Sequence, residues 1–218
     1  MIDQCHLDEV GFAMTLPTTY SWFLQGERLE VPYEAPQGRR VNASGAHFTH
    51  GPEAGRLEYQ SWAVLPKSRA KDPRTTLEAR APAHGLTVDE VGPIDAARVV
   101  AFLWQVAGRA ADAPAAWQRA RPLMIALDNS SVHTSQTVQA ARPQLAAADV
   151  HLVYLARYCP EQSEIEPVWN DVKQHQLPVR SFERVADLKH AVDDALARKA
   201  TQLYQAPAQS TNVHRLST

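Results

Sequence analysis

The sequence has few cysteines, no long apolar run and no apolar leader. Only Cys5 and Cys159 occur among its 218 residues, too few for a disulfide framework or a cysteine-rich zinc site, and each is expected to be a small buried hydrophobic residue. The longest apolar runs, 99–106 and 123–127, are far shorter than the roughly 20 residues that a membrane helix needs. The N-terminus has no basic segment followed by an apolar stretch, which argues against a secretory signal. These absences predict a cytoplasmic protein with no membrane-spanning segment.

An excess of positive charge is also missing. The chain carries 22 basic and 24 acidic residues, a formal net charge of −2, so its overall charge does not indicate a nucleic-acid binder. Residues 61–127 are a net-basic third, with nine basic and six acidic residues. A group of basic residues in this third is either a solvated loop or a surface that contacts phosphates: Lys67, Arg69, Lys71, Arg74 and Arg80.

Several enzyme signatures are absent as well. There is no GxGxxG, no P-loop and no GxSxG sequence, and the nine histidines form no HExxH arrangement. Nucleotide-dependent and Ser-His-Asp chemistries are therefore disfavoured. With 44% hydrophobic and 21% charged residues and no internal repeat, the composition is that of an ordinary folded domain.

What is present is a regular order of apolar segments. Alternating or continuous apolar runs predict strands at 2–7, 20–24, 40–46, 122–127 and 150–155. Helical spacing predicts helices at 94–107, 134–148 with a break or kink at Pro143, 163–175 and 182–200. Residues 66–93 are expected to form a long loop or insertion, and 205–218 a disordered tail. Three early strands with short connections, followed by strand–helix alternation, predict one α/β domain over residues 1–204, with a mixed sheet covered by helices on both faces.

Three carboxylates stand at positions where chemistry can occur. Asp8 and Asp128 each follow a predicted strand, and Glu166 lies in the first turn of the helix after the last strand. Because functional groups of open α/β sheets gather at the carboxyl ends of strands, we expect Asp8 and Asp128 to approach each other if their strands are neighbours. Oxygen ligands without a thiol or histidine cluster suit Mg²⁺ or Mn²⁺. Two such ions can activate water and stabilise the leaving oxygen of a phosphodiester.

Each of these residues also has a purely structural interpretation. Asp128 can cap the next helix or close a turn, and Asp8 can belong to a plain turn. Ser163 and Glu166 have the spacing of a capping box, in which Glu166 bonds back to the amide of Ser163. His133 can be a surface histidine or one bonded within the fold. The spacing alone does not choose between these interpretations.

Several stretches of the chain resemble a known family. In residues 125–133 a predicted strand ends in Asp-Asn and a histidine follows. Residues 155–169 resemble the segment that supplies the third acidic residue of the family's active site, here Glu166. Residues 7–12 are similar to the strand that carries the first active-site aspartate of the family, here Asp8. Residues 20–22 and 38–40 are similar to the hairpin region that follows this strand. In this order, from Asp8 to about Leu196, the pieces resemble the catalytic domain of transposases in the bacterial insertion-sequence branch of the Tc/mariner superfamily.

The resemblance implies an RNase H-like fold and a DDE superfamily endonuclease. Such enzymes use Mg²⁺ or Mn²⁺, as two ions, to cleave DNA at transposon ends and to transfer the freed 3′-hydroxyl to target DNA. Asp8, Asp128 and Glu166 would be the catalytic and metal-binding residues. Accessory roles at the site would fall to three further residues: Asn129, His133 and Lys173. Four basic residues would contact DNA: Lys67, Arg69, Lys71 and Arg74.

The resemblance also implies partners, and the sequence departs from the family at three positions. The partners are transposon-end and target DNA, a second copy of the chain in a homodimer, and a separately encoded helix-turn-helix subunit, because only seven residues precede Asp8. Ala156 stands where the family has proline, Ser163 where it has asparagine, and Glu164 where it has proline. Two alternatives remain: another RNase H-like nuclease that cuts without strand transfer, or a remnant that no longer cleaves and serves as a DNA-binding or oligomerisation module.

Overall fold

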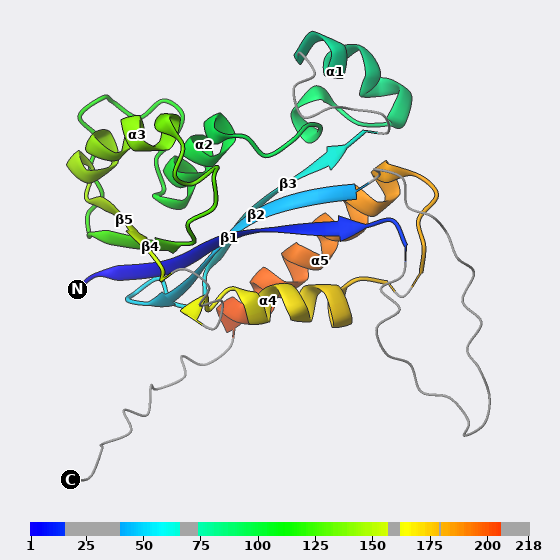
Figure 1. Cartoon of the computed structure of the whole chain (residues 1–218). Helices are drawn as coiled ribbons and strands as arrows, with labels where there is room; N and C mark the ends of the chain where they lie inside the picture. The colour runs from blue at the N-terminus through cyan, green and yellow to red at the C-terminus, as the bar shows by residue number, and fades with distance from the viewer. Residues whose placement is uncertain (16–39, 66–73, 157–161, 179, 206–218) are drawn as a thin grey trace, which may run out of the picture.

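A five-stranded mixed sheet lies between two layers of helices (Figure 1). The computed structural model describes residues 1–15, 40–65, 74–156, 162–178 and 180–205. The strands follow the order β3-β2-β1-β4-β5 and have these bounds: β1 Asp3–Ala13, β2 Arg40–His50, β3 Leu57–Val64, β4 Leu123–Leu127 and β5 Val150–Tyr154. β1, β2 and β3 pair antiparallel, whereas β4 pairs parallel with both β1 and β5. The predicted combination of a meander with parallel strands is confirmed.

The first helical layer consists of α2 (Ala96–Val106) and α3 (Gln136–Ala147). α2 begins at Asp95, whose side chain accepts a hydrogen bond from the amide of Arg98 at 2.9 Å, as expected of an N-cap. Its apolar stripe packs with side chains from α3 and from one face of the sheet, among them Cys5. The Cys5 thiol is fully buried, and burial raises its pKa far above the ordinary value. It therefore acts as the small buried hydrophobic residue that the sequence predicts, while Cys159 lies outside the described residues.

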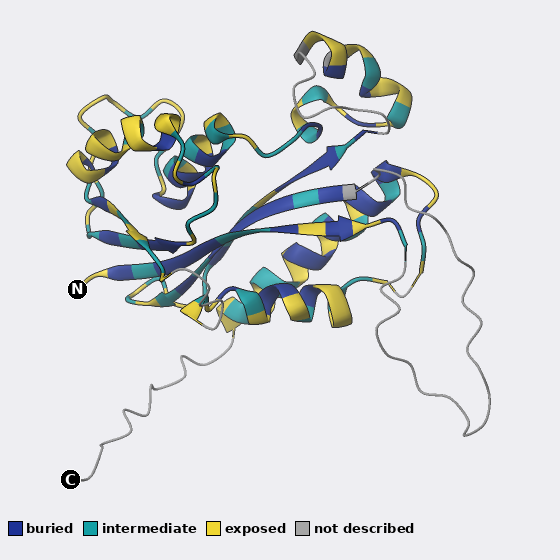
Figure 2. Ribbon diagram, viewed as in Figure 1, coloured by how far each residue is buried: buried dark blue, intermediate teal, exposed yellow. Residues whose placement is uncertain are grey.

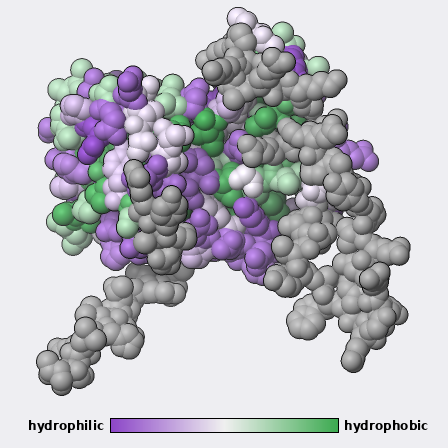
Figure 3. All heavy atoms as spheres, in the orientation of Figure 1, coloured by the Kyte–Doolittle hydropathy of each residue, from purple (hydrophilic) through white to green (hydrophobic). Residues whose placement is uncertain are grey.

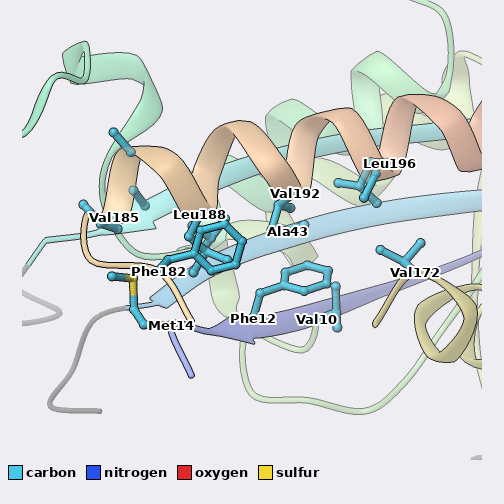
Figure 4. Packing of buried hydrophobic residues seen from close by; sticks show 14 of the residues in the cluster. Val10, Phe12, Met14, Ala43, Val172, Phe182, Val185, Leu188, Val192 and Leu196 are labelled. Atoms are coloured by element: carbon cyan, nitrogen blue, oxygen red, sulfur yellow. The ribbon is translucent and has the colours of Figure 1, made fainter. Parts of the chain in front are cut away.

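The second layer covers the opposite face with α4 (Glu166–Asp171), the π-helical turn η4 (Val172–Gln176) and α5 (Val185–Gln205). Figure 4 shows how α5 lies along this face, with Leu188 and Val192 above Phe12. Burying each such side chain contributes about 1.5–3 kcal/mol. The apolar stripes predicted for both helices are confirmed by full or near-full burial: Ile165, Val168, Trp169 and Val172 in and beside α4, and Val185, Leu188, Val192 and Leu196 in α5.

The segment between β3 and α2 differs from the long loop that the sequence predicts. It contains three short helices, α1 (Arg74–Arg80), η1 (Pro82–His84) and η2 (Val88–Glu90). Leu77, Leu86 and Val91 are buried in the same core as α5, which explains why the chain is ordered here. Residues 66–73 lie outside the described residues.

Four predictions need correction, three of them for strands and one for a helix. β1 does not end before Asp8 but continues to Ala13, because Val10 and Phe12 are buried. β3 was missed by the sequence prediction, since its apolar residues alternate poorly. β5 is an edge strand with Val153 40% exposed, rather than a buried strand. Pro143 lies inside α3, which continues past it, and the predicted strand at 20–24 and the tail after 205 lie outside the described residues.

The burial pattern follows these layers. Figure 2 shows the buried residues concentrated along the sheet and on the helix sides that face it. On the face seen in Figure 3, apolar residues gather near the middle and hydrophilic residues border them. Within the described ranges, no helix combines the length and apolar character required to cross a membrane.

Candidate active site

Asp8 and Asp128 stand side by side at the edge of the parallel β1–β4 pair. The last paired residues of this ladder are Leu7 and Leu127, so the two aspartates occupy the next position on each strand. Side chains alternate along a strand, which places Asp8 on the face of Val10, the face covered by α4 and α5. The expectation that the two carboxylates approach each other follows from this register.

The helix that carries Glu166 packs directly over the strand beside Asp8. Asp8 pairs with Gly45 on β2, and the aromatic ring of Trp169 lies so close that a Cβ added to Gly45 would be 2.3 Å from Trp169 Cη2. Trp169 is one turn after Glu166 on α4, so this contact brings the third acid toward Asp8. Burial, and then the charges of Glu9, Glu166 and Asp128, raise the pKa of Asp8 to about 6. Both other predicted acids, Asp128 and Glu166, therefore lie within electrostatic reach of Asp8.

The Gly45→Ala substitution is expected to displace α4. The added methyl would also be 2.8 Å from Trp169 Cζ2, and the ring is only 2% exposed, so it has little room to move. Overpacking of this kind costs about 1–3 kcal/mol, which chemical denaturation would measure. Gly11→Ala, at an exposed glycine on β1, is the control and should cost much less; equal losses would show that the ring contact is unimportant.

The capping box predicted for Ser163 and Glu166 is not formed. α4 begins at Glu166 rather than at residue 163, its N-cap is Ile165, and no side chain caps it. The amide of Glu166 donates instead to the carbonyl oxygen of Ser163 at 3.2 Å. The buried Ile165 side chain fixes the start of the helix, and the structural explanation for Glu166 loses its main support.

A fully buried histidine joins β1 to the turn that follows β4. His133 Nδ1 lies 2.7 Å from Asp128 Oδ1, and His133 Nε2 lies 2.9 Å from Glu9 Oε1. Burial alone lowers the pKa of His133, but the hydrogen bonds and charges of Glu9 and Asp128 outweigh it and raise the pKa to about 9. Both ring nitrogens then donate, as only the imidazolium can. His133 is thus bonded within the fold, and it fixes the orientation of Asp128.

The turn after β4 also shapes the position of Asp128. The amide of Ser130 donates to Asp128 Oδ1 at 2.9 Å, so the turn interpretation of this aspartate holds as well. Partial burial opposes ionisation, but this amide and His133 together lower the pKa of Asp128. Asn129 donates from Nδ2 to the carbonyl oxygen of Leu155 at 2.6 Å, which ties the ends of β4 and β5 together. Asn129 therefore supports the sheet edge beneath the site.

The other predicted site residues are farther from this centre or not described. Lys173 is exposed in η4. Arg74 begins α1, but its side chain is not described, and Lys67, Arg69 and Lys71 lie outside the described residues. Across the described ranges, no group of three or more His, Cys, Asp and Glu side chains is placed to hold one metal ion together.

Sequence reasoning missed two contributors to this site. Glu9 anchors His133 although 124 positions separate them, and only the neighbourhood of β1 and β4 brings them together. Gly45 matters because of a tryptophan on a distant element. The Asp-Glu pair at positions 8 and 9 was a signal for Glu9, whereas no local pattern marks Gly45.

Comparisons with known proteins bear on the fold and the family. A family model described as DDE superfamily endonuclease matches residues 76–189, more than half of the chain, including Asp128 and Glu166. No curated protein matches the sequence. The region that contains Asp8 lies outside the family match.

Solved structures of the Mos1 transposase have a similar fold. The Mos1 mariner paired-end complex with Mn aligns with a TM-score of 0.56 at 15% identity, covering 92% of this chain and 50% of that chain. The Mos1 strand transfer complex aligns with a TM-score of 0.55 at 16% identity, covering 92% of this chain and 51% of that chain. This chain therefore spans about half the length of the transposase chains that it matches.

The fold and the family follow from these matches. The similarity to Mos1, at such low identity, bears on the fold, and it confirms the RNase H-like α/β class expected from the resemblance. The family match covers more than half of the sequence. The chain belongs to the DDE superfamily endonucleases.

Proposed function

We propose that the chain is the catalytic domain of a Tc/mariner-type transposase of the insertion-sequence branch. It would cleave DNA at transposon ends and transfer the freed 3′-hydroxyl to target DNA, with Asp8, Asp128 and Glu166 as its catalytic residues. The observation that carries this proposal is the pairing of β1 with β4, which places Asp8 beside Asp128, together with the packing of α4 over Gly45, the partner of Asp8. This arrangement supports a site in which Asp8 is shared between Asp128 and Glu166.

The donor set fits divalent metal ions. Carboxylate oxygens are the ligands of Mg²⁺ and Mn²⁺, and Mg²⁺ commonly takes only one or two carboxylates together with water and substrate phosphates. Each ion would then be held by only two carboxylates, one ion by Asp8 and Asp128 and the other by Asp8 and Glu166. No cluster of three carboxylates around one ion is needed. When bound, two such ions activate a water molecule and stabilise the leaving oxygen of a phosphodiester.

Residues of the chain orient the Asp128 carboxylate and determine the negative charge of the site. His133 and the Ser130 amide bond to Asp128 Oδ1 and so restrict the rotation of its carboxylate. Burial first, and then the charges of Glu9, Glu166 and Asp128, raise the pKa of Asp8 to about 6; bound cations would relieve the repulsion among these acids. Such a cation-binding edge would hold a scissile phosphate in one orientation, the main requirement of phosphoryl transfer.

The proposal includes the partners. Transposon-end and target DNA are the substrates, and the solved Mos1 structures of similar fold are paired-end and strand transfer complexes. Lys67, Arg69, Lys71 and Arg74 would contact DNA phosphates. A homodimer and a helix-turn-helix subunit would bring two DNA ends together and supply their recognition.

The test is cleavage and joining of DNA in the presence of Mn²⁺ or Mg²⁺. The chain is incubated with supercoiled plasmid and with an oligonucleotide that ends in a labelled 3′-hydroxyl strand. We expect nicked plasmid and labelled plasmid with either metal, and neither product when a chelator removes the metal. Nicking without joining would favour a simple nuclease, and binding of the DNA without either product would favour an inactive remnant.

A further inference from the structure

Two histidines stand side by side on the sheet beneath the segment that leads to Glu166. His6 on β1 and His47 on β2 are direct partners in the antiparallel register, so their side chains project from the same face. His6 is 4% exposed and His47 is half-buried. Neither histidine contacts the three acids in the hydrogen bonds of the described structure; both contact Glu164 instead.

The two imidazoles take up both main-chain polar groups of Glu164. The amide of Glu164 donates to His6 Nδ1 at 3.3 Å, and His47 Nδ1 donates to the carbonyl oxygen of Glu164 at 3.3 Å. The two rings must therefore be opposite tautomers. In His6 the proton is on Nε2, and in His47 it is on Nδ1. Gln4 Nε2 lies 3.3 Å from His6 Nε2; with this amide turned over, the Gln4 side-chain oxygen would accept that proton.

These bonds act close to a helix start that no side chain caps. α4 begins two residues later, at Glu166, and no side chain caps its N-terminus. Main-chain groups near a helix end need partners outside the helix, and here a rigid pair of central strands supplies them. Burial lowers the pKa of both histidines below the ordinary value, and the charge of Glu164 opposes this shift in each of them.

We infer that His6 and His47 are positioning residues that clamp Glu164 to the sheet and thereby set the position of the Glu166 carboxylate relative to Asp8. The β1–β2 pair carries both Asp8 and the two histidines. The distance between Asp8 and Glu166 therefore depends on a short series of contacts, which runs from the sheet through the imidazoles and the Glu164 main chain to Glu166. The inference rests on the proposed function in one respect, the assignment of Glu166 as a metal ligand.

The experiment compares asparagine with glutamine at each histidine. An asparagine side chain places its amide where histidine has Nδ1, whereas glutamine places it where histidine has Nε2. His6→Asn and His47→Asn should therefore keep the bonds to Glu164, and His6→Gln and His47→Gln should lose them. His50→Gln, at an exposed histidine on β2, is the control.

Two readouts separate positioning from a general effect on the fold. Mn²⁺ binding is measured by calorimetry, and we expect the glutamine variants to bind about tenfold or more weakly, as for other residues that orient metal ligands. The asparagine variants and His50→Gln should stay close to the wild type. Nuclear magnetic resonance of the metal-free protein should show the Nε2 tautomer for His6 and the Nδ1 tautomer for His47. The Glu164 amide should exchange slowly in the wild type and in His6→Asn, and faster in His6→Gln.

The outcomes distinguish this inference from the proposed function. Identical tautomers, or a Glu164 amide that exchanges equally fast in all variants, would overturn the clamp whatever the metal does. If the clamp is seen but asparagine and glutamine variants bind Mn²⁺ equally well, the positioning role is overturned. A wild type that shows the clamp but binds no Mn²⁺, even with DNA present, would overturn the proposed function and with it the role of Glu166.

Discussion

Replacing Asp8 by asparagine is expected to abolish metal-dependent cleavage and, in the metal-free protein, to increase the free energy of unfolding. The carboxylate sits partly buried among Glu9, Glu166 and Asp128, and burial and these charges raise its pKa from 3.8 to about 6. The folded protein thus disfavours the ionised form. An amide of the same size removes this cost but cannot replace a carboxylate as a ligand for two cations.

The pH dependence of this effect has a defined sign. Because the folded state binds the proton of Asp8 more tightly than the unfolded state, the wild type loses stability as pH rises from about 4 to about 6. The full shift corresponds to about 3 kcal/mol. Since Asp8 is only partly buried, we expect about 1–2 kcal/mol at pH 7 after allowance for solvent screening. Asp8→Asn should therefore be more stable than the wild type at pH 7 and equal to it at pH 4.

Urea unfolding in chelator, at pH 4 and pH 7, checks this prediction. Addition of Mn²⁺ should reverse the order at pH 7, because a ligand that binds only the folded wild type stabilises it further. Asp112→Asn, at an exposed carboxylate, serves as the matched control and should change neither stability nor cleavage. A destabilised Asp8→Asn protein at pH 7 would mean that Asp8 has a structural partner, and retained cleavage would remove it from the catalytic residues.

Some of this site could be predicted from local sequence, and some could not. The apolar run of β4 and the acid that follows it are continuous in sequence, so the position of Asp128 after a strand was predictable. The expectation that it lies near Asp8 follows from the rules for parallel strands. The stripe that ends in Trp169 and Val172 was predictable from helical spacing. These features depend on one element or on two adjacent ones.

The remaining features depend on contacts between elements that are distant in sequence. Asp8 was expected at the end of a strand, yet β1 continues past it because Val10 and Phe12 find partners on α5. The capping box of Ser163 and Glu166 was a reasonable local pattern, but the start of α4 is set by burial of Ile165. Tertiary burial outweighed local hydrogen-bonding preference in both places.

Replacing His133 by glutamine is expected to weaken the fold most at low pH and to weaken metal binding. In the wild type the imidazolium donates to Asp128 at 2.7 Å and to Glu9 at 2.9 Å; one glutamine amide cannot reach both. The pKa of His133 is raised from 6.5 to about 9 by these carboxylates, against the effect of its burial. The stabilisation is therefore fully present below pH 6.5 and is lost as pH rises through about 9.

The size of this effect is limited by solvent. The full shift corresponds to about 3 kcal/mol, but the Asp128 side chain is 56% exposed and that of Glu9 21% exposed, so we expect about 2 kcal/mol at pH 6. The difference in unfolding free energy between the wild type and His133→Gln should shrink at pH 9.5 and above. His151→Gln, at an exposed histidine on β5, should show no such pH dependence.

Metal binding provides the second half of the test for His133. Without the imidazolium, Asp128 keeps only the Ser130 amide as its orienting partner, and residues that orient a metal ligand typically change affinity by about 10–100-fold. Mn²⁺ titration of His133→Gln at pH 7.5 should show a loss in this range, and Glu9→Gln should show a smaller loss in the same direction, because Glu9 orients Asp128 through His133. If Glu9→Gln weakened Mn²⁺ binding more than His133→Gln, Glu9 itself would be a ligand and His133 would serve to hold β1 against the turn after β4.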